Sequence, residues 1–478
     1  MSLASGLPTP IRKLLADAEL VLEAPYARRI FTNRDLAFDR ITVIGFDMDY
    51  TLALYRQDEL EALSIRCTLD KLLQRGYPEA LREIRSDPTF AIRGLVVDKR
   101  YGNIIKMDRH GYVGRAFHGK RLLPRPERKS LYRSQRLGTE RERFAPVDTL
   151  FALPEVTLFA EVVDLIDHRP ELWPSGPPTY AQAWLDVREC IDQAHQDGSL
   201  KDLIQGDIGR YFQIDPELGQ TLHKFRSAGK KLFLLTNSLL PYTDHVMRYV
   251  LGGQLAAYDH WRDYFDWVVV GARKPDFFTG AAAFQELDLA DRPLGKPVPE
   301  PKRGRIYLGG NQQGLQTALG VHSDEVLYVG DHIYGDILRS KMHTHWRTAM
   351  VVQEMERELS QVLEHRDALD RLYGFEERRF QLDLELTAKA LDGERDSALR
   401  NEARNLGREI ARLSQEISDA FNPHWGMLFR DRAELSAFGA QSEDYACVYT
   451  SRVSNFRLYS PQWYFRSPRD RMAHELRV

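Results

Sequence analysis

The feature that most constrains the fold is a pattern that occurs four times: an apolar run that ends at polar or charged residues. Short β-branched runs of this kind are typical of buried strands in parallel sheets. Helix-like segments, such as DPELGQTLHKFRSAG at 215–229, lie between the runs. Strands that alternate with helices predict an α/β fold with a parallel sheet. The four runs are ITVIGFD at 41–47, KKLFLLTNS at 230–238, FDWVVVGARK at 265–274 and DEVLYVGDH at 324–332.

The polar ends of these runs predict one site. Ligands of parallel α/β sheets bind outside the carboxyl ends of the strands, so residues that follow neighbouring strands meet there. The sequence contributes Asp47 and Asp49 after the first run, and further polar residues after the other three. These are Thr236, Asn237, Ser238, Lys274 and Asp331.

Two carboxylates spaced i and i+2 after a buried strand suit phosphoryl transfer. Asp47 can attack phosphorus and form an aspartyl-phosphate, while Asp49 acts as general acid and then general base. Two acids beside a phosphate repel it, so this chemistry also needs cations. We expect Mg²⁺ on hard oxygen ligands, with Asp331 among them, and Lys274 as a point charge.

The remaining motif residues complete this hypothesis. Thr236, Asn237 and Ser238 offer donors to phosphate oxygens, and Asp336 of VGDHIYGD can orient the metal set from a second shell. Each motif alone has a simpler interpretation: TNS as a turn or helix cap, and GDHIYGD at 330–336 as an acidic loop or a helix start. Their order, each at a strand end, favours the site.

The spacing of the runs predicts the domain organisation. We expect a catalytic core at 1–55 and 226–352, because one crossover helix does not fill the gap between the first two strands. An inserted cap domain at 56–225 would select substrates. Charged residues with Leu, Ile and Ala at helical spacing predict a long helical hairpin at 353–420. The final segment, 421–478, is expected to pack back on the core, and the stretch at 294–311, rich in Pro and Gly, to be a loop or hairpin.

Composition excludes several partners. The 66 Lys and Arg residues against 69 Asp and Glu give a net charge of -3, which does not attract nucleic acid or anionic membranes. The arginine-rich stretch at 120–144 is interpreted as a solvated loop, with a polyphosphate effector surface as the second choice. No stretch has the length of an apolar membrane span, and neither a signal sequence nor paired cysteines appear, so we expect a cytoplasmic protein.

The motifs FDMDYTL, LLTNS, ARKPDFF and YVGDHIYGDILRSK resemble those of the haloacid dehalogenase (HAD) superfamily. Further similarity, in RGLVVDKRYGNIIKMDRHG, LFALPE and DVRECIDQAHQDGSLK, is to the cytosolic purine 5′-nucleotidase family that prefers IMP and GMP. The resemblance implies a Rossmann-like core, Mg²⁺-dependent hydrolysis of purine nucleoside monophosphates, phosphotransferase activity, a nucleotide effector and a homo-oligomer. It also implies that Mg²⁺ is held by Asp47, Asp331 and the carbonyl of Asp49.

The resemblance assigns base recognition to the inserted segment. Arg188 and Asp192 match residues that bind the purine, with His195 nearby, and these three share one helical face at i, i+4 and i+7. Without the resemblance, Arg188 and Asp192 would be interpreted as a surface ion pair. Phe151 matches an aromatic residue that stacks on the base, although a core role is about equally compatible.

Departures from the family pattern leave alternatives open. They affect base preference and effector activation, and they occur at Ala152, Gln196, Arg452, Asn455 and Phe456. One alternative is a HAD phosphatase that acts on another phosphorylated metabolite. The other is a nucleotide-binding scaffold whose helical hairpin is the working surface.

Overall fold

A computed structural model of the chain describes residues 25–84, 87–133, 142–338, 344–391, 396–431 and 434–468. Its centre is a nine-stranded sheet with the order β1-β19-β16-β15-β3-β11-β12-β14-β13. All neighbours from β19 to β14 are parallel, and the two edge strands, β1 and β13, are antiparallel. The predicted α/β class with a parallel sheet is therefore confirmed.

The four predicted strands lie side by side in the middle of this sheet. They are β15 (Val326–Gly330), β3 (Val43–Phe46), β11 (Lys231–Leu235) and β12 (Trp267–Val270). All four are parallel, so their carboxyl ends meet at one edge, as the sequence predicts. Both faces of these strands are buried, which explains why their sequences are apolar without alternation.

Sequence reasoning did not find the other strands of this sheet. Three of them extend the sheet at one end: β16 (Arg347–Val351), β19 (Val448–Thr450) and β1 (Phe31–Thr32). At the opposite edge, β13 (Phe284–Leu287) and β14 (Ile306–Gly309) pair antiparallel, and β14 lies inside the stretch 294–311, for which a loop or hairpin was expected.

Side chains alternate between two cores on the faces of the sheet. Ile44 and Phe46 of β3 join the larger core with α8 (Leu218–Ser227) and α9 (Leu240–Leu251), whereas Val43 joins the second core with α11 (Gln312–Leu319). Gly45 also points to the second face. A Cβ there would lie 2.0 Å from the ring of Phe233, so only glycine allows this close approach.

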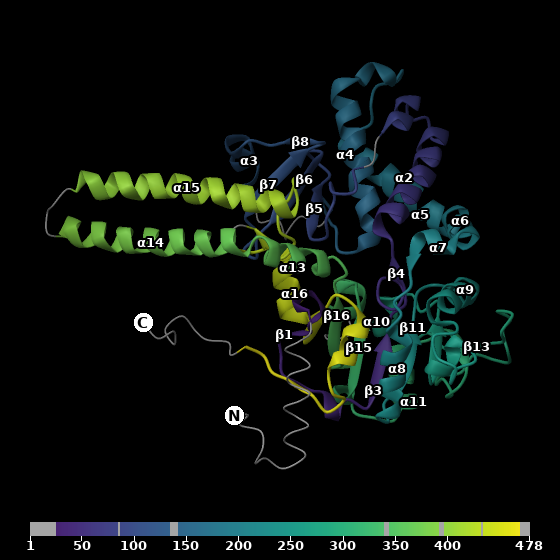
Figure 1. Cartoon of the computed structure of the whole chain (residues 1–478). Helices are drawn as coiled ribbons and strands as arrows, with labels where there is room; N and C mark the ends of the chain where they lie inside the picture. Colours follow the sequence, from purple (N-terminus) through teal and green to yellow (C-terminus); the bar gives the residue numbers. More distant parts are fainter. Residues whose placement is uncertain are drawn as a thin grey trace, which may run out of the picture.

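The segment between β3 and β11 contains a second sheet and several helices (Figure 1). The antiparallel sheet has the order β8-β7-β6-β5-β9, with β5 (Leu95–Asp98), β6 (Asn103–Met107) and β7 (Val113–His118) at its centre. Its edge strands are β8 (Arg121–Leu122) and β9 (Phe144–Pro146). The long helices here are α2 (Gln57–Gln74), α4 (Leu153–His168) and α5 (Tyr180–Gln196). The division into core and cap domains stays a prediction.

Three helices occupy the segment expected to form a hairpin. α13 (Met355–Glu364) packs on the body through Met355, and a break at His365 separates it from α14 (Arg366–Leu391). α14 and α15 (Ser397–Phe421) lie side by side and project from the body (Figure 1). No helix among the described residues is long and apolar enough to cross a membrane.

The arginine-rich stretch is described only in part, because residues 134–141 lie outside the described ranges. The first part of the stretch contains α3 (Arg125–Tyr132). Two arginines of the stretch, which lie outside α3, form ion pairs. Arg121 pairs with Glu127, and Arg143 makes two hydrogen bonds to the buried carboxylate of Asp98. Arg143 therefore contacts β5, which contains Asp98, whereas Arg121 and Glu127 form an ion pair at the surface.

Candidate active site

Lys274 is the charged centre of the site. Its ammonium group lies 2.8 Å from Asp47 Oδ1 and 2.6 Å from Asp336 Oδ1, and it donates to the hydroxyl of Tyr328 at 3.1 Å. Only 4% of the side chain is exposed. Burial alone would lower the pKa of Lys274, but the carboxylates of Asp336 and Asp47 hold it well above the ordinary value.

Three carboxylates converge beside this ammonium group. Oxygen atoms of Asp47, Asp331 and Asp336 all lie within 4.8 Å of one another, and all three residues are buried. Burial raises the pKa of Asp47 to about 8, against the opposing charge of Lys274, and it raises the pKa of Asp331 well above the usual range. A buried acidic cluster of this kind is costly unless cations neutralise it.

The residues of this cluster fit a magnesium ion. Mg²⁺ prefers hard oxygen ligands, and the cluster offers three carboxylates. Asp331 Oδ2 is buried without a hydrogen-bond partner, which leaves an acceptor available for a cation. Asp336, for which a second-shell position was expected, lies next to the other two, and its oxygens accept hydrogen bonds from Lys274 and from the backbone N–H of His332, which is compatible with that position. Gly330 permits this arrangement, because a Cβ there would lie 2.6 Å from that of Asp336.

Asp49 is oriented differently from the metal cluster. Its carboxylate accepts hydrogen bonds from the hydroxyls of Tyr55 at 2.7 Å and Ser238 at 3.1 Å. The next residue, Tyr50, has a φ of 55°, a left-handed conformation that turns the chain away from β3. Burial raises the pKa of Asp49, and the two hydroxyl donors oppose that rise. This carboxyl group is therefore fixed in place and suited to holding a proton.

The loop after β11 connects the other strand ends. The side chain of Asn237 donates to the carbonyl of Lys274 at 3.0 Å and accepts from its backbone N–H at 2.6 Å. Thr236 Oγ1 accepts from the backbone N–H of Ser238 at 3.1 Å. Asn237 thus fixes the backbone of Lys274, and Ser238 fixes Asp49.

The residues expected to bind the base lie on the adjoining helices. The Phe151 ring packs edge-on against Tyr50, with centroids 4.7 Å apart, and against His195 at 5.9 Å. Phe151 therefore connects the loop after Asp49 with α5. Arg188 contacts the buried Glu155 at 2.9 Å and Asp192 at 3.6 Å, so its guanidinium already has anionic partners. Burial lowers the pKa of His195 to about 4, which keeps the imidazole neutral near pH 7.

Sequence reasoning missed several residues that the structure places at the site. The guanidinium of Arg93 is fully buried, donates to the carbonyl of Asp331 at 2.9 Å, and makes two hydrogen bonds to Glu354 at 2.7 and 2.6 Å. Lys201, on α6 (Ser199–Gly206), interacts electrostatically with both Asp49 and His195. No local pattern identifies Arg93, because its partners are more than 200 residues away in the sequence, and Tyr55 lies close to Asp49 in the sequence but outside any motif.

Comparisons with known proteins identify the family of the chain. The model of the 5′ nucleotidase family matches residues 30–477. A 5′-nucleotidase domain-containing protein of Dictyostelium discoideum is 30% identical over 459 residues, which are 94% of this chain and 75% of that protein. Two crystal structures of CbbY from Rhodobacter sphaeroides also match, one with xylulose-(1,5)bisphosphate and one with phosphate. Each is 14% identical and covers 65% of this chain and 86% of its own, with TM-scores of 0.24 and 0.22.

Proposed function

The chain belongs to the 5′ nucleotidase family and is a phosphoric monoester hydrolase, and we propose that its substrates are purine nucleoside 5′-monophosphates of the IMP and GMP type. The products would be the nucleoside and phosphate. The observation that carries this proposal is the meeting of Asp47 and Asp49, which follow β3, with Lys274, which follows β12 on the other side of the parallel strand β11. That arrangement supplies a nucleophile, a proton donor and a cation at one place.

Asp47 and Asp49 divide the chemistry between them. A carboxylate oxygen of Asp47 attacks phosphorus, and the P–O bond to the 5′ oxygen breaks as an aspartyl-phosphate forms. Asp49 gives its proton to the leaving 5′ oxygen. It then takes a proton from the water that attacks the aspartyl-phosphate, so Asp47 and inorganic phosphate are released. The raised pKa of Asp49 suits this exchange, because the acid must hold a proton when the first step begins.

The remaining groups would hold the phosphate. Mg²⁺, bound by Asp47, Asp331 and the carbonyl of Asp49 with Asp336 beside them, would neutralise the charge of the phosphoryl oxygens. Lys274 adds a positive charge next to the nucleophile, and residues 236–238 offer backbone and hydroxyl donors. Phosphotransfer would use the same intermediate, with a nucleoside hydroxyl in place of water.

We propose that Phe151, Arg188, Asp192 and His195 contact the base. The edge-on contact between Phe151 and His195 places the two rings next to one another and next to the loop after Asp49. A neutral imidazole can donate one hydrogen bond and accept another, which suits the carbonyl and ring nitrogen of a 6-oxopurine. Because half of the Arg188 side chain is exposed, its guanidinium can reach a ligand while keeping Glu155.

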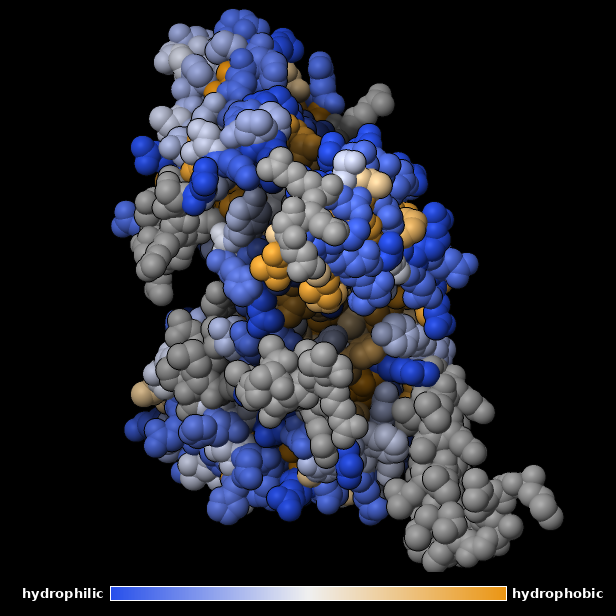
Figure 2. Space-filling view, turned by 90° about the vertical axis from the view of Figure 1, so that its left-hand side faces the viewer, coloured by the Kyte–Doolittle hydropathy of each residue, from blue (hydrophilic) through white to orange (hydrophobic). Residues whose placement is uncertain are grey.

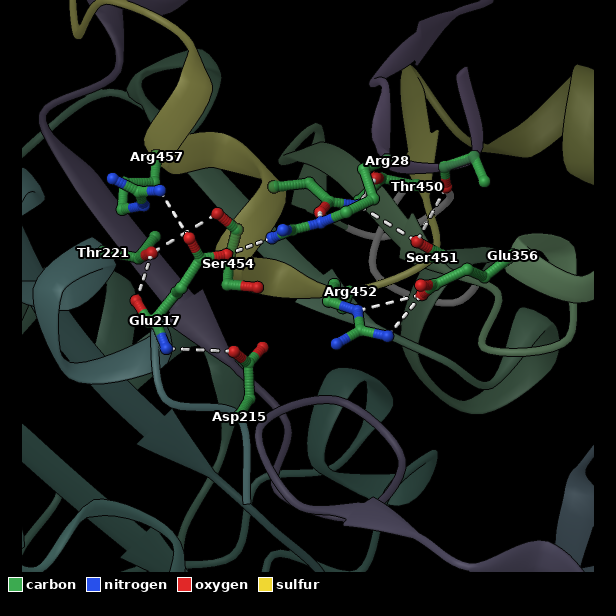
Figure 3. Close-up of polar contacts among 12 residues, drawn as sticks. Arg28, Asp215, Glu217, Thr221, Glu356, Thr450, Ser451, Arg452, Ser454 and Arg457 are labelled. Atoms are coloured by element: carbon green, nitrogen blue, oxygen red, sulfur yellow. Dashed lines mark hydrogen bonds and ion pairs between the residues drawn. The ribbon is translucent and has the colours of Figure 1, made fainter. Parts of the chain in front are cut away.

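A nucleotide effector would need its own site, and a cavity of about 440 Å³ next to β4 (Leu54–Tyr55) supports one. Arg357 and Arg452 line it, and Arg452 bonds Glu356, as Figure 3 shows. Gln353, which also lines the cavity, donates to the carbonyl of Tyr55 at 2.8 Å.

We also propose that the protein binds a nucleotide effector, transfers phosphate to a nucleoside and forms a homo-oligomer. We propose a cytoplasmic location as well, because all three cysteines are buried and none forms a disulfide.

An alternative substrate class is another phosphorylated metabolite. The observation that favours it is the ion pairing of Arg188, which already satisfies part of its charge with Glu155 and Asp192. The chemistry at Asp47 would be the same. Only the groups on α4 and α5 would contact a different leaving group.

The decisive experiment measures phosphate release from the purified chain with Mg²⁺. IMP and GMP should be hydrolysed faster than AMP, pyrimidine nucleotides and sugar phosphates. Asp47→Asn should abolish turnover of every substrate, because an amide is a poor nucleophile. Chelation of the divalent ion should do the same, with activity restored by added Mg²⁺.

Two results would contradict the proposal at different levels. If Asp47→Asn keeps its activity, the aspartyl-phosphate mechanism is wrong. If the wild type does not hydrolyse IMP or GMP but hydrolyses another phosphate ester, and Asp47→Asn abolishes that activity, the mechanism holds and the purine assignment is wrong. Asp35→Asn is a suitable control, because it removes a carboxylate whose hydrogen bonds are to Tyr464 and Ser467, away from the site.

A further inference from the structure

α14 exposes a row of large apolar side chains. The row consists of Tyr373, Phe380, Leu384 and Leu391, which are 59%, 60%, 56% and 84% exposed. Their spacings of 7, 4 and 7 residues place all four within about 20° of one line along the helix, at 100° per residue. Isolated exposed apolar residues are ordinary, but an aligned row is typical of a surface that binds a partner. We call this row the α14 stripe.

The opposite face of α14 already has a partner within the hairpin. Leu382 is completely buried and lies half a turn from the α14 stripe. Leu372 and Phe375, about 100° and 160° from the line of the stripe, pack with Leu413, Ile417 and Phe421 of α15. The stripe is therefore a second apolar face, which the hairpin itself does not need. Figure 2 looks at the molecule from the side to which the hairpin projects in Figure 1, and it shows apolar atoms exposed near the middle of this face.

The positions of the stripe are symmetric along the helix. Tyr373 and Leu391 are each nine residues from Leu382, and Phe380 and Leu384 are each two residues from it. If two copies of α14 pack antiparallel about a twofold axis near residue 382, Tyr373 lies against Leu391 of the partner subunit. Phe380 then lies against Leu384 of the partner subunit. Such self-complementarity is what an isologous interface requires.

The charges beside the stripe are compatible with this register. Glu376 and Glu377 flank the stripe on either side in the first half of the helix. In the antiparallel pair they fall opposite the positions of Ala388 and Thr387, which carry no charge. The pairing therefore brings no like charges together, whereas a parallel pair would align Glu376 and Glu377 with their own copies.

We propose that the α14 stripe is a homodimer interface, in which two hairpins pack antiparallel into a four-helix arrangement. The four side chains of one copy can remove about 500 Å² from water, so two copies bury on the order of 1,000 Å². That area is at the lower end for a specific interface, so the dimer forms in a concentration-dependent way. This proposal does not depend on the catalytic function.

The test measures the mass of the full chain by sedimentation velocity over a range of concentrations up to about 100 μM. We expect the wild type to gain mass by a factor of two as concentration rises. The double variant Phe380→Asp/Leu384→Asp should halve the mass reached, because two charges per copy enter the apolar centre. Ala390→Asp is the matched control, since it adds a carboxylate to the same helix about 100° from the stripe, and it should leave the mass unchanged.

A cross-linking experiment tests the register. Tyr373→Cys and Leu391→Cys, mixed and treated with a short bismaleimide, should give a heterodimer between the two variants, while each variant alone gives little product. Self-cross-linking of each variant alone would indicate a parallel pair and overturn the proposed geometry. A wild type that stays monomeric, or a double variant that keeps the wild-type mass, would overturn the interface itself. If the double variant lowers the stability of the monomer itself, the stripe is covered within its own chain, and the interface proposal is wrong.

Discussion

The carboxylate of Asp49 has a fixed orientation, because two hydroxyl groups donate hydrogen bonds to it. Tyr55, only 2% exposed, donates to one oxygen, and its hydroxyl lies 3.0 Å from that of Tyr242 on α9. Ser238 donates to the other oxygen. The general acid of the proposed mechanism is thus held from two elements, β4 and the loop after β11, so Tyr55 is a positioning residue.

Replacing Tyr55 by Phe tests this role. The change removes one donor, so the pKa of Asp49 should rise further and its carboxyl group should become less well oriented. We expect kcat for a nucleotide to fall by about 10-fold or more, with a smaller change in KM. The loss should be smaller for p-nitrophenyl phosphate, whose leaving group needs no proton. Tyr242→Phe, which keeps the bond from Tyr55 to Asp49, should lose less, and a loss confined to KM would contradict the assignment.

The neutral state of His195 predicts a pH dependence of stability. The pKa of His195 is about 4 in the folded protein, and its ordinary value is 6.5, because burial opposes the charged form and nearby Lys201 and Arg188 add to the effect. Between pH 6.5 and 4 the unfolded state binds more protons, so acidification lowers the free energy of unfolding. The lowered pKa of His195 changes the free energy of unfolding by at most about 3 kcal/mol over this pH range. His195→Gln should therefore lose less stability than the wild type in denaturant titrations over this window, and identical slopes would contradict the prediction.

At the scale of elements, the hairpin shows how a helix can be longer than its local sequence favours. α14 contains Gly374 in its interior, where a glycine costs roughly 0.5–1 kcal/mol relative to alanine. A Cβ at Gly374 would meet nothing within 4 Å. Packing against α15 therefore compensates for a locally weak position.

Replacing Gly374 by Ala should stabilise the hairpin by about 0.5–1 kcal/mol. Amide hydrogen exchange along α14 should slow by several-fold, because local opening then costs more. Gly407→Ala in α15 is the control, since a Cβ there would lie 3.1 Å from Arg379 Nη1, which donates to the carbonyl of Ala403. Gly407→Ala should therefore stabilise the hairpin less than Gly374→Ala does. Equal slowing at both positions would show that available space does not decide the effect.

At the scale of the whole molecule, Arg93 joins three parts of the chain. It lies just before β5 of the five-stranded sheet, donates to the carbonyl of Asp331 at the end of β15, and bonds Glu354 just before α13. Its guanidinium is also 3.9 Å from Asp331 Oδ2. The segment that contains the five-stranded sheet and the acidic cluster are therefore connected through one buried cation.

Arg93→Met should lower the free energy of unfolding by about 3–5 kcal/mol, because it leaves buried carboxylates without their partner. It should also change the Mg²⁺ concentration needed for activity, since Asp331 loses its neighbouring charge. Arg143→Met is the matched control: it breaks a buried Arg–Asp pair in the five-stranded sheet and should destabilise similarly without altering the Mg²⁺ dependence. Unchanged Mg²⁺ dependence in Arg93→Met would contradict the coupling.

The sequence alone predicts the centre of this protein because local signals there are strong. Four buried parallel strands need continuous apolar runs, and polar residues at their ends stand out against them. Since neighbouring parallel strands end at the same edge, the order of the motifs was enough to bring Asp47, Lys274 and Asp331 together. The strands β16 and β19 have weaker signals, because β16 begins with the polar residues Arg347 and Thr348 and β19 has only three residues.

Only the tertiary structure decided what surrounds that centre. The contacts of Tyr55 with Tyr242 and of Arg93 with Glu354 join residues 187 and 261 positions apart, and no local pattern specifies such pairs. The same holds for Asp336, which lies with Asp47 and Asp331 because Gly330 leaves room for it. The identity of the proposed reacting groups follows from residue type and strand order. Their orientation and protonation follow from burial and from distant partners, which exist only once the chain has folded.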